Sequence, residues 1–143
     1  MTKLFIDANV LIDISVTGRP SSQDSLLFYQ FLLENNSIFE LFTSCDLLTT
    51  IYYVLRRQLN KEDALGKIKI INKIFSVVEF GNIEVDEAIE LMERNEKYVD
   101  LEDTIQYVMA RKEKCDYIIT NDNSFASGDV PVLSSEEALR KFT

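Results

Sequence analysis

Short apolar segments alternate with longer amphipathic segments along the whole chain, and this alternation constrains the fold more than any other feature. Buried strands are predicted at 3–6, 38–44, 76–80, 116–120 and 130–133, where the sequence is short and apolar. Helices are predicted between and after them, at 21–36, 46–59, 61–75, 84–95, 99–114 and 134–142. Strands that alternate with helices in this way indicate an α/β fold with a mostly parallel sheet.

The first predicted helix illustrates how the buried faces are assigned. Either Ser21 or Ser22 is expected to cap its N-terminus, since serine is among the preferred capping residues. The apolar side of the helix is expected to consist of Leu26, Leu27, Phe31 and Leu33.

The length of 143 residues suits one domain, residues 1–143, with a sizeable core. No apolar run approaches the roughly 20 residues that a membrane-spanning helix needs. The two cysteines, Cys45 and Cys115, have neither a metal-binding spacing nor a disulfide pattern. A reducing cytoplasm is therefore the expected location.

The charge and the residue types restrict the chemistry. The net charge is -9, which argues against a broad basic surface for binding nucleic acid, although metal ions held by carboxylates could still meet phosphates. The chain contains no histidine, so it has no imidazole base for Ser-His-Asp or Cys-His catalysis and lacks the commonest zinc ligand. Any catalysis is expected to use carboxylates, hydroxyls, lysines or arginines.

Acids follow two of the predicted strands. Asp7 comes directly after the first strand, and Asp122 follows the fourth in the stretch TNDNSF. In open parallel sheets, functional sites form beyond the carboxyl ends of the strands, where the strand order reverses. Asp100 and Asp103, in VDLED, provide further carboxylates. A group of acids without histidine suits Mg²⁺ or Mn²⁺ and points to metal-assisted hydrolysis of phosphodiesters.

Each acid also has a purely structural interpretation. Asp7 could begin a turn, and Asp122 lies in a turn-like sequence. Asp100 occupies a position typical of a helix N-cap, and Asp103 three residues later imitates a capping box. Capping explains Asp100 better than a metal role does. The functional prediction therefore depends on the acids lying together.

Several stretches together resemble the PIN-domain family and, within it, the VapC-type toxin ribonucleases. The resemblance covers nearly the whole chain and is most specific in FIDANVLID and in DLEDTIQYVMARKEKCDYIITND. It implies a three-layer α/β/α sandwich whose parallel five-stranded sheet has the order 3-2-1-4-5. It also implies RNA cleavage with Mg²⁺ or Mn²⁺, a homodimer, and inhibition by a small antitoxin protein. By position, the family's catalytic and metal-binding acids correspond to Asp7, Asp103 and Asp122, with Asn9, Thr120 and Ser124 in supporting places.

One position departs from the family pattern. Many members carry a Glu early in the second predicted helix after the first strand, where this chain has Thr50. Asp46 lies one helical turn earlier and shares a face with Thr50, so it could partly replace the missing acid. The alternative, that Asp46 is simply the N-cap of this helix, is favoured because Asp is a preferred capping residue.

Contacts with a substrate are predicted less specifically. Arg56, Arg57, Arg111 and Lys112 are candidates for binding phosphates, although such charges usually lie on solvated helix faces. An aromatic side chain can stack on a nucleic-acid base, and Tyr53 is expected to lie half-buried beside the site, with Tyr52 in the core.

Two functions from different classes remain. The first is a metal-dependent endoribonuclease, the toxin of a type II toxin–antitoxin pair, which leaves 5′-phosphate and 3′-hydroxyl ends. The second is a weak or inactive PIN-like module that binds RNA or a protein partner, which the residues Thr50 and Ser124 in acidic positions make conceivable. A phospho-acceptor signalling domain is disfavoured, because Ala8 and Asn9 follow Asp7 where it would need another acid.

Overall fold

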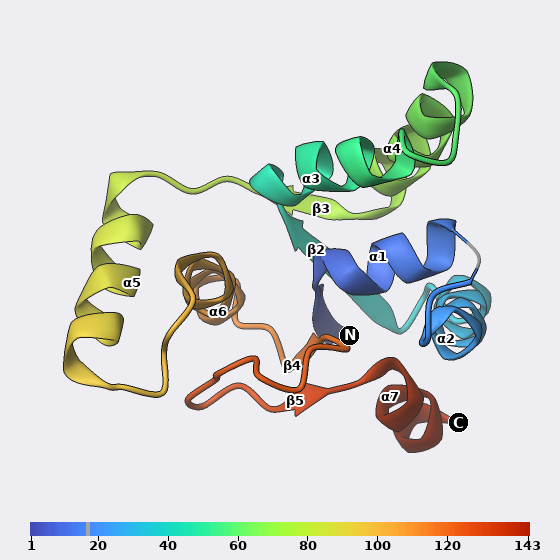
Figure 1. The fold of residues 1–143 in the computed structure, drawn as a ribbon. Coiled ribbons are helices and arrows are strands. Elements are labelled where there is room, and N and C mark those ends of the chain that lie inside the picture. Colours follow the sequence, from blue (N-terminus) through green and yellow to red (C-terminus); the bar gives the residue numbers. More distant parts are fainter. Residues whose placement is uncertain (17) are drawn as a thin grey trace.

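The computed structural model describes residues 1–16 and 18–143, and it contains one parallel sheet in the order β3-β2-β1-β4-β5 (Figure 1). This confirms the predicted fold class and strand order. The chain builds the sheet outward from β1 through β2 to β3 and then returns to add β4 on the other side of β1. The strands are β1 (Thr2–Ile6), β2 (Phe39–Ser44), β3 (Ser76–Val78), β4 (Tyr117–Ile119) and β5 (Val132–Leu133).

Helices cover both faces of the sheet, and each face has its own apolar core. Side chains alternate along a strand, so Leu4 and Ile6 of β1 pack on one face while Phe5 packs on the other. Figure 1 shows α5 and α6 on one side of the sheet and α1, α2 and α7 on the opposite side. The helices are α1 (Ala8–Ser15), α2 (Ser22–Glu34), α3 (Cys45–Leu55), α4 (Lys61–Ile74), α5 (Asn82–Arg94), α6 (Leu101–Lys112) and α7 (Ser135–Phe142).

Helix α1 is absent from the sequence-based prediction. Its apolar residues Val10, Leu11 and Ile12 are all buried, together with Asp13. The helix has only 8 residues and follows β1 with Asp7 alone between them, so it is easily taken as part of the segment after the strand.

The predicted apolar side of α2 is wrong for three of its four residues, whereas Phe31 packs partly buried against the core as predicted. Phe28 and Leu32 are buried, whereas Leu26, Leu27 and Leu33 are each more than 40% exposed. Ser21 is the N-cap residue but makes no side-chain capping bond.

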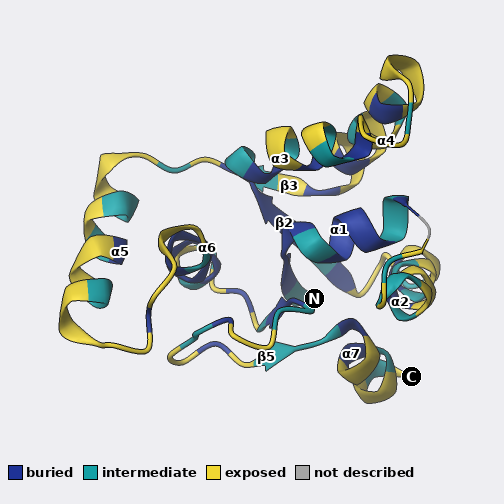
Figure 2. Cartoon of the chain, in the orientation of Figure 1, coloured by how far each residue is buried: buried dark blue, intermediate teal, exposed yellow. Residues whose placement is uncertain are grey.

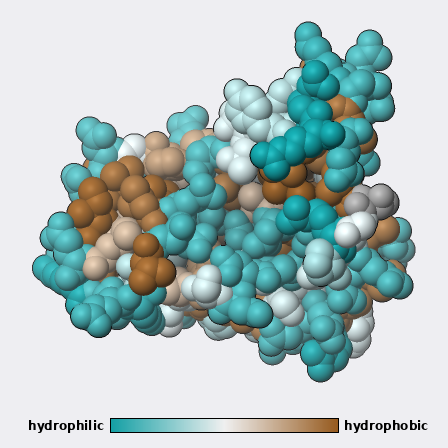
Figure 3. Space-filling view, in the orientation of Figure 1, coloured by the Kyte–Doolittle hydropathy of each residue, from teal (hydrophilic) through white to brown (hydrophobic). Residues whose placement is uncertain are grey.

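The most deeply buried parts of the molecule are the central strands and the sheet-facing sides of α1 and α6 (Figure 2). The surface in Figure 3 is largely hydrophilic, with a hydrophobic area on the side where α5 lies. In the described part of the chain, no helix is both long and apolar enough to cross a membrane. Cys45 and Cys115 are both free thiols, as the sequence predicts.

Candidate active site

Asp7 lies at the carboxyl edge of the sheet, where β1 ends and α1 begins. The register pairs Ile6 of β1 with Ile119 of β4, so Asp7 and Thr120 leave the sheet side by side. Asp7 begins a helix rather than a turn, because its Oδ1 accepts a hydrogen bond from the Ala8 amide at 2.7 Å and caps α1. The carboxylate is 5% exposed, so its partners decide how costly its burial is.

The second oxygen of Asp7 is held by polar side chains. Thr120 Oγ1 donates a hydrogen bond to Asp7 Oδ2 at 2.8 Å, and Asn9 Nδ2 donates to the same oxygen at 3.1 Å. The Thr120 hydroxyl in turn accepts a bond from the Asp122 amide at 3.1 Å. The supporting places predicted for Asn9 and Thr120 are therefore next to Asp7, and Thr120 connects it to Asp122.

The pKa of Asp7 lies above its ordinary value of 3.8. Burial is the main cause, and the negative charge of Asp122 acts in the same direction. Hydrogen bonds from Thr120 and Ala8 act in the opposite direction, because they favour the ionised form, and the nearby amide of Gln106 acts with them.

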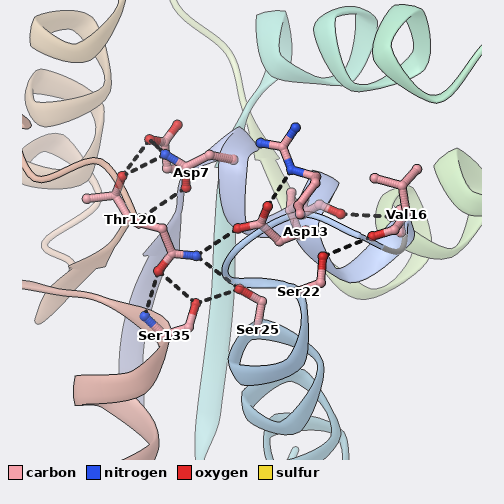
Figure 4. Close-up of polar contacts among 12 residues, drawn as sticks. Asp7, Asp13, Val16, Ser22, Ser25, Thr120 and Ser135 are labelled. Carbon is pink, nitrogen blue, oxygen red and sulfur yellow. Dashed lines mark hydrogen bonds and ion pairs between the residues drawn. The ribbon is translucent and has the colours of Figure 1, made fainter. Parts of the chain in front are cut away.

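Asn121 anchors this edge of the sheet to three helices, as Figure 4 shows for its partners. Its Nδ2 donates to Asp13 of α1 at 2.9 Å and to Ser25 of α2 at 3.0 Å, and its Oδ1 accepts from the Ser135 amide of α7 at 3.0 Å. Its backbone amide donates to Asn9 Oδ1 at 3.1 Å. Sequence reasoning missed this residue, although it stands between Thr120 and Asp122.

Asp103 faces a pocket of about 210 Å³ at the N-terminus of α6. Asp100 caps this helix by accepting a bond from the Asp103 amide at 2.9 Å, which confirms its predicted capping role. The reciprocal bond of a capping box is not formed, so the Asp103 carboxylate is not used for capping. The pocket lining includes Lys97, Asp100, Asp103, Thr104, Asp122 and Ser124.

The surroundings of Asp103 raise its pKa to about 7. Burial is the largest cause, followed by the negative charges of Asp7, Asp100, Asp122 and Glu102. Burial and neighbouring negative charges both disfavour the ionised form of Asp103. A bound cation would favour that ionised form.

Asp122 has a structural partner at the pocket. Its Oδ1 accepts hydrogen bonds from the Ser124 amide at 2.9 Å and the Ser124 hydroxyl at 2.6 Å. Ser124 therefore orients Asp122 in the place where many family members have a further acid.

Glu102 is an exposed acid next to Asp103 that sequence reasoning missed, although it stands within the VDLED stretch. Burial and the charges of Asp46, Asp7 and Asp100 raise its pKa. The capping alternative for Asp46 is wrong, because Ser44 occupies the N-cap position of α3 and its hydroxyl donates to Asp46. Thr50 is exposed.

Gln106 is a second residue that sequence reasoning missed. It is 1% exposed, and neither its Nε2 nor its Oε1 has a hydrogen-bond partner among the described residues. It nevertheless lies close enough to Asp7 to lower the pKa of that carboxyl group. Buried amides without partners are rare and costly, which marks this position as unusual.

The acids fit a hydrated divalent cation, but they are not a finished ligand set. Within the described residues, no three Asp, Glu, His or Cys side chains are placed to hold a metal together. Like charges repel one another and keep these carboxylates apart. Asp7 accepts a hydrogen bond from Thr120, and Asp122 accepts one from Ser124. Mg²⁺ usually keeps several waters and needs only one or two carboxylates, so close convergence of all the acids is not required.

The predicted RNA contacts lie outside this pocket lining. Tyr53 is 72% exposed instead of half-buried, so that expectation is wrong, while Tyr52 packs partly buried against the core as predicted. Arg56 and Arg57 are exposed at the end of α3. Positive charge in the pocket comes from Lys97, whose ammonium group donates to the Ser127 carbonyl at 2.9 Å. Arg111 and Lys112 pair with Glu87 and Glu84 of α5.

Comparison with known proteins identifies the family. Residues 3–124 match the PIN domain family. This chain belongs to the PIN domain family. It is 47% identical to "Ribonuclease VapC1" of Aquifex aeolicus over 135 residues. The matched region covers 94% of this chain and 92% of that protein. The resemblance predicted from the sequence is thus confirmed.

Solved structures of VapC and VapBC proteins share the fold at low sequence identity. VapBC2 from Rickettsia felis, bound to a promoter DNA fragment, matches with a TM-score of 0.71 and 15% identity over 93% of this chain and 98% of that one. VapC20 from Mycobacterium tuberculosis, a toxin that cleaves the sarcin-ricin loop, matches with a TM-score of 0.68 and 16% identity over 85% of this chain and 92% of that one.

Proposed function

We propose that this PIN protein is a metal-dependent endoribonuclease and the toxin of a type II toxin–antitoxin pair. The observation that carries the proposal is the group of mutually repelling acids at the switch point between β1 and β4. The relative that is 47% identical is named a ribonuclease, and nucleases of this family generally depend on a divalent metal. The specific ions proposed are Mg²⁺ and Mn²⁺, which prefer carboxylate oxygens.

Asp7, Asp103 and Asp122 would hold the cation, and each would be positioned by a different part of the chain. Thr120 and Asn9 fix Asp7, Ser124 fixes Asp122, and the capped first turn of α6 presents Asp103. A divalent cation in this place supplies a Lewis acid that activates water and neutralises charge on a phosphodiester.

Three further residues extend the site. Glu102 and Asp46 add negative charge at its edge, so that they compensate for the Thr50 that stands in place of the usual Glu. Lys97, on the loop before α6, would contact an RNA phosphate beside the acids.

The partners are proposed from the same relatives. VapBC complexes contain a toxin and its antitoxin, so we infer that a small antitoxin protein binds this chain and that the chain forms a homodimer, as the family resemblance implies. A net charge of -9 favours a partner with a basic segment.

Metal removal tests this function. Purified protein incubated with a long RNA should cleave it in the presence of Mg²⁺ or Mn²⁺ and lose more than about 90% of its activity in EDTA, because charge on the phosphate would then be unopposed. Gel electrophoresis measures the cleavage, and the products should carry 5′-phosphate and 3′-hydroxyl ends.

Two results would contradict the endoribonuclease. Full cleavage in EDTA would show that the reaction needs no metal ion. Products with a 2′,3′-cyclic phosphate would show that the 2′-hydroxyl of the RNA, and not water, is the nucleophile. RNA binding without cleavage at any concentration of Mn²⁺ would favour the inactive binding module instead.

A further inference from the structure

The side-chain amide of Gln106 is almost fully buried but lacks a hydrogen-bond partner in the described part of the chain. Gln106 is 1% exposed, and both polar atoms of its amide lack a partner among the described residues. The neighbouring residues on α6, Ile105, Tyr107 and Val108, are buried and belong to the apolar core beside β1. An apolar side chain of the same size would fill this position at lower cost, so packing alone does not account for a glutamine.

The position of Gln106 relates it to the acid pocket. It follows Asp103 by three residues on α6, so the two side chains project from neighbouring places on one face of the helix. It also lies within reach of Asp7, where its amide favours the ionised carboxylate without forming a hydrogen bond of normal geometry. Gln106 therefore lies near Asp7 and one helical turn from Asp103.

The Asp7 carboxylate already accepts three hydrogen bonds from other residues. Ala8, Asn9 and Thr120 each donate a hydrogen bond to the Asp7 carboxylate. These donors come from α1 and from the residue after β4, whereas Gln106 belongs to α6.

We propose that Gln106 is a positioning residue that orients Asp7 and completes its own hydrogen bonds only when the acid pocket holds a hydrated divalent cation. This inference rests on the proposed function, because it assumes that the pocket binds a cation. The amide supplies both a donor for the Asp7 carboxylate and an acceptor for water that enters with the ion. The metal-free protein is destabilised by the unpartnered amide, and metal binding recovers that stability.

The substitution Gln106→Met tests the proposal, since methionine keeps the length of the side chain and removes its hydrogen bonds. We expect the dissociation constant for Mn²⁺, measured by calorimetry, to rise at least about tenfold, as is typical when a group that orients a metal ligand is lost. The melting temperature without metal should rise by about 4 °C, because the buried unpaired amide is gone. Met109→Leu, an apolar change at a fully buried position of the same helix, is the matched control and should leave Mn²⁺ affinity unchanged.

A measurement on the wild-type protein keeps the test independent of how well the variant folds. The side-chain amide resonances of Gln106 should shift and exchange more slowly with solvent when Mg²⁺ is added, while those of the exposed Gln30 and Gln58 stay in place. Unchanged Mn²⁺ affinity in Gln106→Met, or Gln106 resonances that do not respond to Mg²⁺ bound by the wild type, would overturn the inference alone. Failure of the wild type to bind Mn²⁺ would overturn the metal site of the proposed function as well.

Discussion

Asp7→Asn is expected to lower Mg²⁺-dependent RNA cleavage by about 10³-fold, because the charge on the carboxylate contributes several kcal/mol through the metal ion. The change keeps the size of the side chain and its cap on α1, so folding should be retained. Cleavage of a labelled RNA under single-turnover conditions measures the effect, and circular dichroism verifies the fold.

The matched control for Asp7→Asn is Asp86→Asn. Asp86 is an exposed acid on α5, so its replacement removes one negative charge from the surface and leaves the pocket intact. Activity of the control should stay within about twofold of the wild type, since isolated surface charges contribute little. Equal cleavage by the Asp7 variant and the wild type would refute the assignment of the site.

Asp103→Asn is expected to reduce the pH dependence of the stability of the metal-free protein. The folded-state pKa of Asp103 is about 7, against an ordinary value of 3.8. Between these values the folded chain holds a proton that the unfolded chain has released, so the stability falls as the pH rises from about 4 to about 7. The raised pKa values of Asp7 and Glu102 act with the same sign. No histidine is present to titrate in this range.

The measurement is thermal unfolding in EDTA at pH 5.5 and pH 8. The wild type should melt at a higher temperature at pH 5.5, and Asp103→Asn should be more stable than the wild type at pH 8 by about 1–2 kcal/mol. This difference in stability is smaller than the free energy equivalent to the pKa shift of Asp103, because solvent reaches part of that side chain and screens its charge. The affinity of the wild type for Mn²⁺ should weaken below about pH 7 as protons compete for Asp103.

A different pattern would contradict this account of Asp103. If the metal-free wild type melts at a lower temperature at pH 5.5 than at pH 8, the folded protein stabilises the ionised carboxylates without a cation. The pKa of Asp103 would then not be raised. The Asp86→Asn control should retain the pH dependence of the wild type.

The arrangement of strands was predictable because it depends on a strong local signal. Buried strands and amphipathic helices each leave a periodic pattern, and the order 3-2-1-4-5 followed from the family resemblance. Helix α1 was missed since it is short and follows β1 directly after Asp7, and the wrong face of α2 was chosen since six of its thirteen residues are apolar. In both places the tertiary contacts, rather than the local pattern, decide which side is buried.

The site was predictable to the extent that its acids stand at strand ends or in quoted motifs. Asp7 and Asp122 follow strands whose carboxyl ends meet at one edge of the sheet. Asn121 and Gln106 could not be found in the same way, because their significance comes from partners that are present or absent across the fold. A glutamine within an apolar helical segment was the available signal for Gln106, and it is visible in the sequence DTIQYVMA.

The position of the metal ion tests the central claim most directly. Crystals soaked in Mn²⁺ and measured at a wavelength where manganese scatters anomalously would locate the ion without reference to activity. The account predicts an anomalous peak at the carboxyl edge of the sheet, bounded by the carboxylates of Asp7, Asp103 and Asp122. A protein that cleaves RNA with Mn²⁺ but shows its peak elsewhere, or none at these acids, would contradict it.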